Sequence, residues 1–135
     1  MPYLPDTNVW IHHLNPAPSI AKTKLQSHSP SQIVLCDVVK AELYYGAYKS
    51  ARREANLTVL VALFAGFGSF PFEGEAARLC GEIRADLARK GTPIGPYDLQ
   101  IAAIALANDC ILVTHNTGEF SRIAGLRLED WEVEK

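Results

Sequence analysis

Short apolar runs alternate along this chain with longer segments of helical periodicity, and this alternation narrows the possible folds more than any other feature. Strands are expected at Tyr3 to Asp6, Ile33 to Cys36 and Cys110 to Thr114. A final short strand is expected within Leu126 to Val133, and Ser69 to Phe72 is at most a short edge strand because Pro71 cannot donate to a ladder. Alternation of this kind predicts an α/β three-layer sandwich, with a mostly parallel sheet of about five strands and helices on both faces.

The expected helices follow from apolar spacing and from helix-breaking residues. The segment after Asp98 is almost wholly apolar, which is typical of a helix buried on most sides. The segment that begins near Arg53 ends at the breakers Gly66 and Gly68. The helices are expected at about Asn8 to Leu14, Ser19 to Ser27, Val38 to Lys49, Arg53 to Phe64, Glu75 to Arg89 and Leu99 to Ala107.

Length and composition predict one ordinary globular domain spanning residues 1–135. The chain is 48% apolar and 21% charged, and 135 residues can bury a conventional core. Three widely spaced cysteines, Cys36, Cys80 and Cys110, suit reduced thiols rather than disulfides. The start of the chain has no signal-peptide pattern, and no run reaches the ~18 apolar residues of a membrane span. We therefore expect a cytoplasmic protein with no membrane partner.

Three acids, Asp6, Glu42 and Asp98, lie where an apolar run gives way to a helical segment. Acids at strand-to-helix junctions can converge, because ligands of open α/β sheets bind outside the carboxyl ends of the strands. Carboxylate oxygens suit Mg²⁺ or Mn²⁺, and neither His nor Cys occurs at zinc-ligand spacing. Each acid also has a purely structural interpretation, since Asp6 and Asp98 suit helix N-caps and Glu42 suits an exposed helix face.

Four short segments around these acids follow one another along the chain. They are Asp6-Thr7-Asn8, Ala41-Glu42-Leu43 with Gly46, Asp98 before Ile101-Ala102-Ala103, and Val113-Thr114-His115-Asn116 running on to Glu119-Phe120. In this order and spacing they resemble the motifs of the PIN-domain ribonucleases, and among them the VapC-type toxins of toxin–antitoxin pairs. The resemblance covers nearly the whole chain. One departure is Pro5, where relatives usually carry a residue that donates a backbone hydrogen bond, so the first strand is expected to end one residue early.

This resemblance implies a metal-dependent endoribonuclease whose acids hold one or two Mg²⁺ or Mn²⁺ ions. Asp6, Glu42 and Asp98 match the three main acids of the family. Asn116 stands where many relatives have Asp, so the fourth ligand would act through an amide oxygen or a water, and Glu119 is the candidate for the missing charge.

The chemistry gives each matched residue a role. Hydrolysis of a phosphodiester needs an activated water and neutralised phosphoryl oxygens, which a metal pair about 4 Å apart supplies. Asp6 and Asp98 are expected as principal ligands, with Glu42 as a further ligand or as the base that orients the water. Thr7 and Thr114 are expected to fix the carboxylates through their hydroxyls.

The resemblance also implies partners: a VapB-like antitoxin, a second copy of the chain in a homodimer, and a structured RNA such as transfer or ribosomal RNA. Operator DNA would be bound only through the antitoxin. The apolar helical hairpin between Val38 and Phe67 is the region expected to contact the second copy or the antitoxin. Tyr44, Tyr45 and Tyr48 suit either base stacking or packing, and packing is the preferred interpretation.

Two other function classes compete with this one. A phosphatase or phosphoacceptor also gathers acids and Mg²⁺ at strand ends, but Asn8 stands where the phosphatase needs a second Asp, and Thr114-His115-Asn116 stands where the phosphoacceptor needs Lys. A non-catalytic PIN-like module that only binds RNA or protein is the main alternative. The net charge of −2 does not exclude RNA, since bound cations would neutralise clustered acids.

Overall fold

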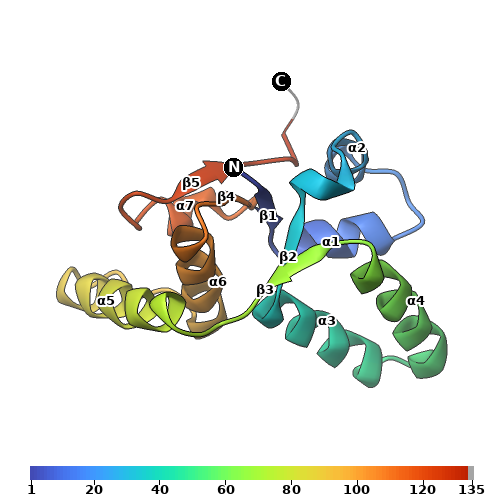
Figure 1. Ribbon diagram of the computed structural model, residues 1–135, viewed down its shortest axis with the longest axis horizontal. Coiled ribbons are helices and arrows are strands. Elements are labelled where there is room, and N and C mark those ends of the chain that lie inside the picture. Colours follow the sequence, from blue (N-terminus) through green and yellow to red (C-terminus); the bar gives the residue numbers. More distant parts are fainter. Residues whose placement is uncertain (134–135) are drawn as a thin grey trace.

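The computed structural model describes residues 1–133, in which five short parallel strands are covered by helices on both faces (Figure 1). The strands are β1 (Tyr3–Pro5), β2 (Val34–Cys36), β3 (Gly68–Phe70), β4 (Ile111–Val113) and β5 (Arg127–Glu129). The helices are α1 (Thr7–Leu14), α2 (Ile20–Gln26), α3 (Asp37–Lys49), α4 (Arg53–Ala65), α5 (Glu75–Arg89), α6 (Pro96–Ala107) and α7 (Thr117–Phe120), with a 3₁₀ turn at Pro30–Gln32.

The sheet topology confirms the predicted parallel α/β architecture. Strand β4 lies between β1 and β5, and β2 pairs with β3, all in parallel. A single parallel bridge between Tyr3 and Ile33 joins the two groups, giving the order β3-β2-β1-β4-β5. Strand β3 is therefore an edge strand, as Pro71 indicated, and the sheet's strands all point the same way.

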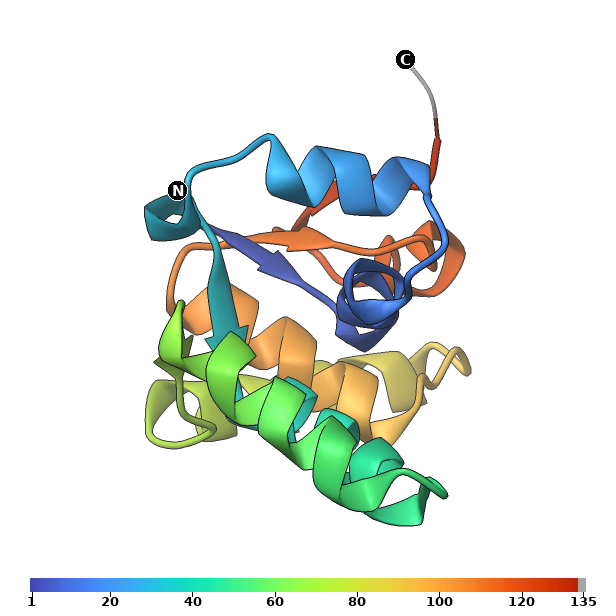
Figure 2. The same ribbon diagram turned by 90° about the vertical axis from the view of Figure 1, so that its right-hand side faces the viewer.

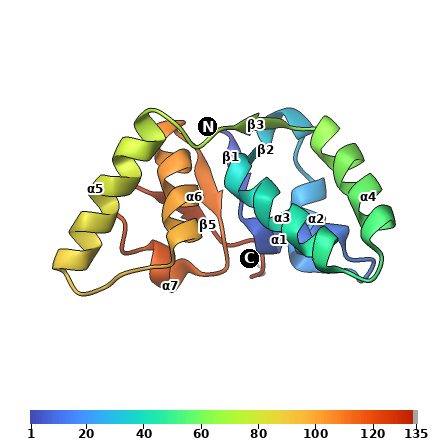
Figure 3. The same cartoon turned by 90° about the horizontal axis from the view of Figure 1, so that it is seen from below.

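The layers are visible when the molecule is turned. In Figure 2, β1 and β4 lie between α2 on one side and α4 and α6 on the other. Figure 3 shows α5 and α6 toward one end of the molecule and α3 and α4 toward the other. The helix pairs α5 with α6 and α3 with α4 pack against each other. This arrangement brings α3 and α6 close to the point where β1 ends.

Helix α6 is the most deeply buried helix. Leu99, Ile101 to Ala105 and the neighbouring strand residue Leu112 are all buried. The apolar composition of this segment is the reason, since a helix without a polar face is stable only inside the core. Each fully buried large side chain contributes about 1.5–3 kcal/mol relative to exposure. The helix is thus a rigid base for the residues at its start, including Asp98.

The first strand ends at Pro5, one residue before Asp6, as the proline led us to expect. Pro5 itself lies within β1 opposite Val113, and the Asp6 N–H still donates to the Val113 carbonyl over 2.9 Å. Amide groups alternate between the two sides of a strand, so the Asp6 N–H faces β4 and the missing N–H of Pro5 falls on the other side. On that side β1 has only the bridge from Tyr3, so proline costs the ladder nothing.

The final short strand expected within Leu126 to Val133 is β5, Arg127–Glu129. The chain then turns, and the Asp130 carboxylate accepts from the Glu132 N–H over 2.9 Å. Trp131 stacks on His28 with ring centroids 4.9 Å apart. The short helix α7 and the 3₁₀ turn were not predicted, since neither is long enough to show a periodic pattern.

No helix in residues 1–133 is long and apolar enough to cross a membrane. The thiols of Cys36, Cys80 and Cys110 are free. Burial raises the pKa of both the Cys36 and the Cys110 thiol to about 11, so these two side chains behave as neutral parts of the core.

Candidate functional site

A cavity of about 810 Å³ opens between the starts of α1 and α6 and one face of α3. Its lining includes all three acids that the sequence singled out, Asp6, Glu42 and Asp98. They come from three segments far apart in the chain, and the parallel topology brings them together where β1 and β2 end and where α6 begins. The predicted convergence of these acids is therefore present in the structure.

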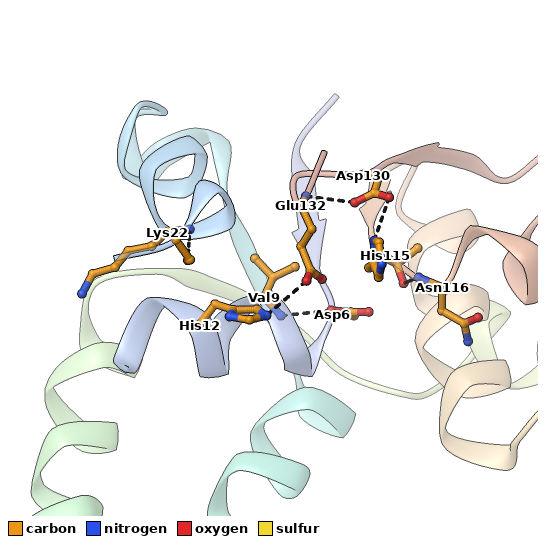
Figure 4. Close-up of polar contacts among 10 residues, drawn as sticks. Asp6, Val9, His12, Lys22, His115, Asn116, Asp130 and Glu132 are labelled. Carbon is orange, nitrogen blue, oxygen red and sulfur yellow. Dashed lines mark hydrogen bonds and ion pairs between the residues drawn. The ribbon is translucent and has the colours of Figure 1, made fainter. Parts of the chain in front are cut away.

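Asp6 follows β1 directly and is 8% exposed. One carboxylate oxygen accepts from the Val9 N–H over 3.1 Å, so Asp6 caps α1 as the structural interpretation predicted. Burial raises its pKa and the Glu132 carboxylate adds to this, while hydrogen bonds from the Thr114 side chain and the Val9 backbone oppose it. Figure 4 shows the Asp6 side chain at the start of α1, between Glu132 and Asn116. The capping role and the position in the cavity are compatible.

Glu42 lies on the face of α3 that borders the cavity and is half-buried. The Thr7 hydroxyl donates to its Oε1 over 2.5 Å, across 35 positions of sequence. This bond holds the carboxylate against the first turn of α1. The interpretation of Glu42 as an ordinary exposed helix residue is therefore wrong, and Thr7 fixes Glu42 rather than its neighbour Asp6.

Asp98 is the third residue of α6. The N-cap of that helix is Gly95, so the alternative interpretation of Asp98 as an N-cap is wrong. Burial raises the pKa of Asp98 to about 6, and repulsion from Glu119, Glu42 and Asp6 contributes in that order. The carboxylates thus interact electrostatically, and without a cation the site disfavours holding all of them ionised.

Asn116 and Glu119 lie beside the cavity and are not among its lining residues in the described part of the chain. The Asn116 side chain donates to Glu119 Oε2 over 2.8 Å, and its backbone N–H donates to the Thr114 hydroxyl over 3.0 Å. Thr114 is fully buried and so fixes both Asp6 and the backbone of Asn116. Glu119 acts on the site through its charge, which raises the pKa of Asp98.

The donor groups at this site are oxygens, which suit Mg²⁺ or Mn²⁺ better than softer metals. Within residues 1–133, no three side chains of His, Cys, Asp or Glu stand close enough together to enclose a metal ion as they are arranged here. The Val9 N–H donates to one oxygen of Asp6, and the Thr7 hydroxyl donates to one oxygen of Glu42. A bound cation would neutralise the repulsion that contributes to the raised pKa of Asp98.

The sequence did not predict the part that the end of the chain plays. Glu132 pairs with His12 over 3.2 Å, and Asp130 pairs with His115 over 3.0 Å (Figure 4). The hydrogen bond and charge of Asp130 raise the pKa of His115. Two more carboxylates therefore lie at the edge of the site. Their only signal was the acidic run Glu129-Asp130-Trp131-Glu132, which by itself is typical of a solvated chain end.

The cavity also has residues that the prediction of acids overlooked. Asp37, Lys49 and Gln100 line it together with two tyrosines, Tyr45 and Tyr97. Of these, the sequence interpretation considered Tyr45, and it counted Lys49 among the basic residues available around the acids. The spacing on α3 from Val38 through Glu42 and Tyr45 to Lys49 was a usable signal, because residues three or four apart share a helix face.

Comparison with known proteins assigns the sequence and the fold to one family. The sequence model of the PIN domain matches residues 3–126. The tRNA(fMet)-specific endonuclease VapC of Salmonella typhimurium is 38% identical over 129 residues, covering 96% of this chain and 97% of that protein. Ribonuclease VapC2 of Rickettsia felis is 35% identical over 98% of this chain and 99% of its own length. A chain from the DNA-bound VapBC structure of Salmonella typhimurium superposes with a TM-score of 0.88 at 37% identity, covering 97% of this chain and 98% of that one.

Proposed function

The chain belongs to the PIN domain family, and from that membership we propose that it is a VapC-type toxin, an endoribonuclease dependent on Mg²⁺ or Mn²⁺ that cleaves structured RNA. The observation that carries the proposal is the meeting of Asp6, Glu42 and Asp98 in one cavity. The raised pKa of Asp98, to about 6, supports it, because a cluster of carboxylates that repel one another is suited to a cation. Residues 1–135 would form a single PIN-like domain.

The metal would be held by Asp6, Asp98 and Glu42, with Asn116 through its amide oxygen or a water and Glu119 as the outer charge. Such ions activate a water, neutralise the phosphoryl oxygens and stabilise the leaving oxygen. The protein's own part is to fix the carboxylates in place. The Val9 N–H and the Thr114 side chain fix Asp6, while the Thr7 hydroxyl fixes Glu42.

Glu42 would act as a further ligand or as the base that orients the attacking water. Its Oε1 accepts from the Thr7 hydroxyl, which holds the carboxylate against α1. Asp98, at the start of the buried helix α6, would bind the cation in its ionised form, so acidification through its pKa of about 6 would weaken binding. The proposed catalytic residues are therefore Asp6, Glu42, Asp98 and Asn116.

The relatives suggest the substrate and the partners. One relative is named as a tRNA(fMet)-specific endonuclease, and related solved structures are VapBC complexes, some of them bound to DNA. We therefore propose transfer RNA as the first substrate class to test and a VapB-like antitoxin as the inhibitor. The chain would act in the cytoplasm as a homodimer, and it would reach operator DNA only through the antitoxin.

Cleavage of RNA by the purified chain tests the proposal directly. Bulk transfer RNA is incubated with the wild-type chain in Mg²⁺ or Mn²⁺, with and without EDTA, beside the variants Asp98→Asn and Asp86→Asn. Asp86 is a suitable control because its carboxylate forms exposed ion pairs with Arg89 and Lys90 on α5, outside the cavity. Discrete fragments from the wild type and the control, absent with EDTA and with Asp98→Asn, are expected. Cleavage that survives EDTA would contradict metal dependence.

Induced expression provides the matching test in cells. Growth arrest is expected with the wild type and not with Asp98→Asn. Equal arrest with both proteins would mean that toxicity comes from binding, which would favour the non-catalytic PIN-like module.

A further inference from the structure

Two tyrosines form part of the wall of the acid-containing cavity. Tyr45, on α3, and Tyr97, on α6, both line it, and they are 66% and 59% exposed. Large aromatic rings in a concave site have an energetic cost in water and commonly mark a ligand surface. These two rings are on different helices that border the same acids.

The three tyrosines of α3 have different surroundings. Tyr44 packs edge-on against Phe64, with ring centroids 5.3 Å apart, and so serves the contact between α3 and α4. Tyr48 is 54% exposed but is not among the residues that line the cavity. Tyr45 lines the cavity, and the Lys49 ammonium lies 5.2 Å from the centre of its ring. The preference for packing is therefore right for Tyr44, whereas the ring of Tyr45 is available to a ligand.

The positions of the rings relative to the acids suit a nucleic-acid strand. Tyr45 follows Glu42 by three residues, about 4.5 Å along the helix axis, and Tyr97 directly precedes Asp98. A phosphate at the acids would thus have an aromatic ring nearby on each of two helices. The cavity follows α3 from Asp37 to Lys49, a length of about 18 Å at 1.5 Å per residue, which exceeds one nucleotide.

We propose that Tyr45 and Tyr97 stack on unpaired bases of the RNA substrate next to the scissile phosphate, and that Lys49 pairs with a neighbouring phosphate. Aromatic rings beside a basic side chain are the usual means of holding a single-stranded segment. The inference rests on the proposed function, and it assigns the substrate segment as unpaired RNA. A protein partner packed on these rings is the competing occupant, and it is distinguished in the test.

The test measures kcat and KM for bulk transfer RNA with single variants of the full chain. Tyr45→Leu and Tyr97→Leu remove the rings, while Tyr45→Phe and Tyr97→Phe keep them. Tyr48→Leu is the matched control, because it lies on the same helix with similar exposure but outside the cavity. We expect each Leu variant to raise KM about 5- to 150-fold, with the Phe variants and Tyr48→Leu close to wild type.

Lys49→Ala supplies a second readout. If Lys49 pairs with one phosphate, its loss should reduce the slope of log binding constant against log salt by about 0.7, the value for one contact to a single strand. Equilibrium binding of bulk transfer RNA to the Asp98→Asn chain over a range of NaCl concentrations measures this slope without cleavage. An unchanged slope would overturn the assignment of Lys49.

Several results would overturn the stacking. A wild-type KM in both Leu variants would do so. An equal rise in KM with Tyr48→Leu, or with the Phe variants, would do so as well. A changed oligomeric state of Tyr45→Leu in light scattering would mean that the ring packs against protein. If the wild type cleaves RNA, such results refute this inference alone, whereas a wild type that neither binds nor cleaves RNA refutes the proposed function and this inference with it.

Discussion

The Thr7 hydroxyl donates to Glu42 Oε1 over 2.5 Å, joining the first turn of α1 to the middle of α3. Because Thr7 immediately follows Asp6, this one bond sets the position of Glu42 relative to the first acid. The site thus depends on a contact between two helices as well as on the ends of the strands.

Replacing Thr7 should therefore impair catalysis more than folding. Thr7→Val removes the hydroxyl at nearly constant volume, and we expect a fall in kcat of about 10- to 100-fold, the usual effect of losing a residue that orients a ligand. Thr7→Ser should restore most of the activity. Thr58→Val is the control, since the Thr58 hydroxyl bonds only to the Glu54 carbonyl on the exposed helix α4. Kinetics on bulk transfer RNA measure the change, and unaltered kcat in Thr7→Val would contradict the role.

Neutralising Asp98 should stabilise the metal-free protein. The carboxylate is repelled by Glu119, Glu42 and Asp6, so Asp98→Asn at pH 8 in EDTA should raise the melting midpoint by roughly 2–4 °C. The same variant should lose the further rise that Mn²⁺ gives the wild type. Differential scanning calorimetry measures both effects. A metal-induced rise as large in Asp98→Asn as in the wild type would exclude Asp98 as a ligand.

The stability of the metal-free protein should fall as the pH rises from about 4 toward 7. The pKa of Asp98 is raised from 3.8 to about 6 in the folded state. Between these values the folded chain binds more protons than the unfolded chain, so unfolding free energy decreases with rising pH and levels off above the folded pKa. Urea denaturation in EDTA at several pH values measures the trend. Asp98→Asn should flatten this part of the curve, and an unchanged slope in the variant would contradict the assignment.

Truncation of the central strand should have a large effect on folding. Leu112 is fully buried in β4, between β1 and β5. We expect Leu112→Ala to lower the unfolding free energy by about 2–5 kcal/mol, through lost burial and the cavity that remains. Val59→Ala, at a position 49% exposed on α4, should cost well under 1 kcal/mol. Urea denaturation of both variants makes the comparison, and similar losses would show that β4 is not central to the core.

The sequence predicted the elements and the three acids because both depend on short-range patterns. Asp6 and Glu42 could be placed since the segments around them alternate in a way that only a parallel α/β sheet accommodates. The positions of Asp130 and Glu132 could not be predicted from the sequence. They depend on the stacking of Trp131 against His28, more than 100 residues earlier in the chain. Pairs this distant leave no periodic signal.

The same limit applies to details at single residues. Whether Pro5 interrupts a ladder depends on which neighbour its nitrogen faces, and the strand order decides that. Whether Tyr45 or Tyr48 borders the cavity depends on the rotation of α3 about its axis, which the contact with α4 fixes through Tyr44 and Phe64.

The burial of α6 on nearly every side restricts how the cavity can be controlled. Moving Asp98 would require moving the helix that carries it, and Leu99 and Ile101 to Ala105 bind that helix into the core. A molecule that inhibits this site by bending it would have to disrupt the core, whereas one that fills or covers the opening would meet no such resistance. The architecture therefore favours control by obstruction, with an inhibitor that competes for the space the substrate needs and leaves the backbone beneath it unchanged.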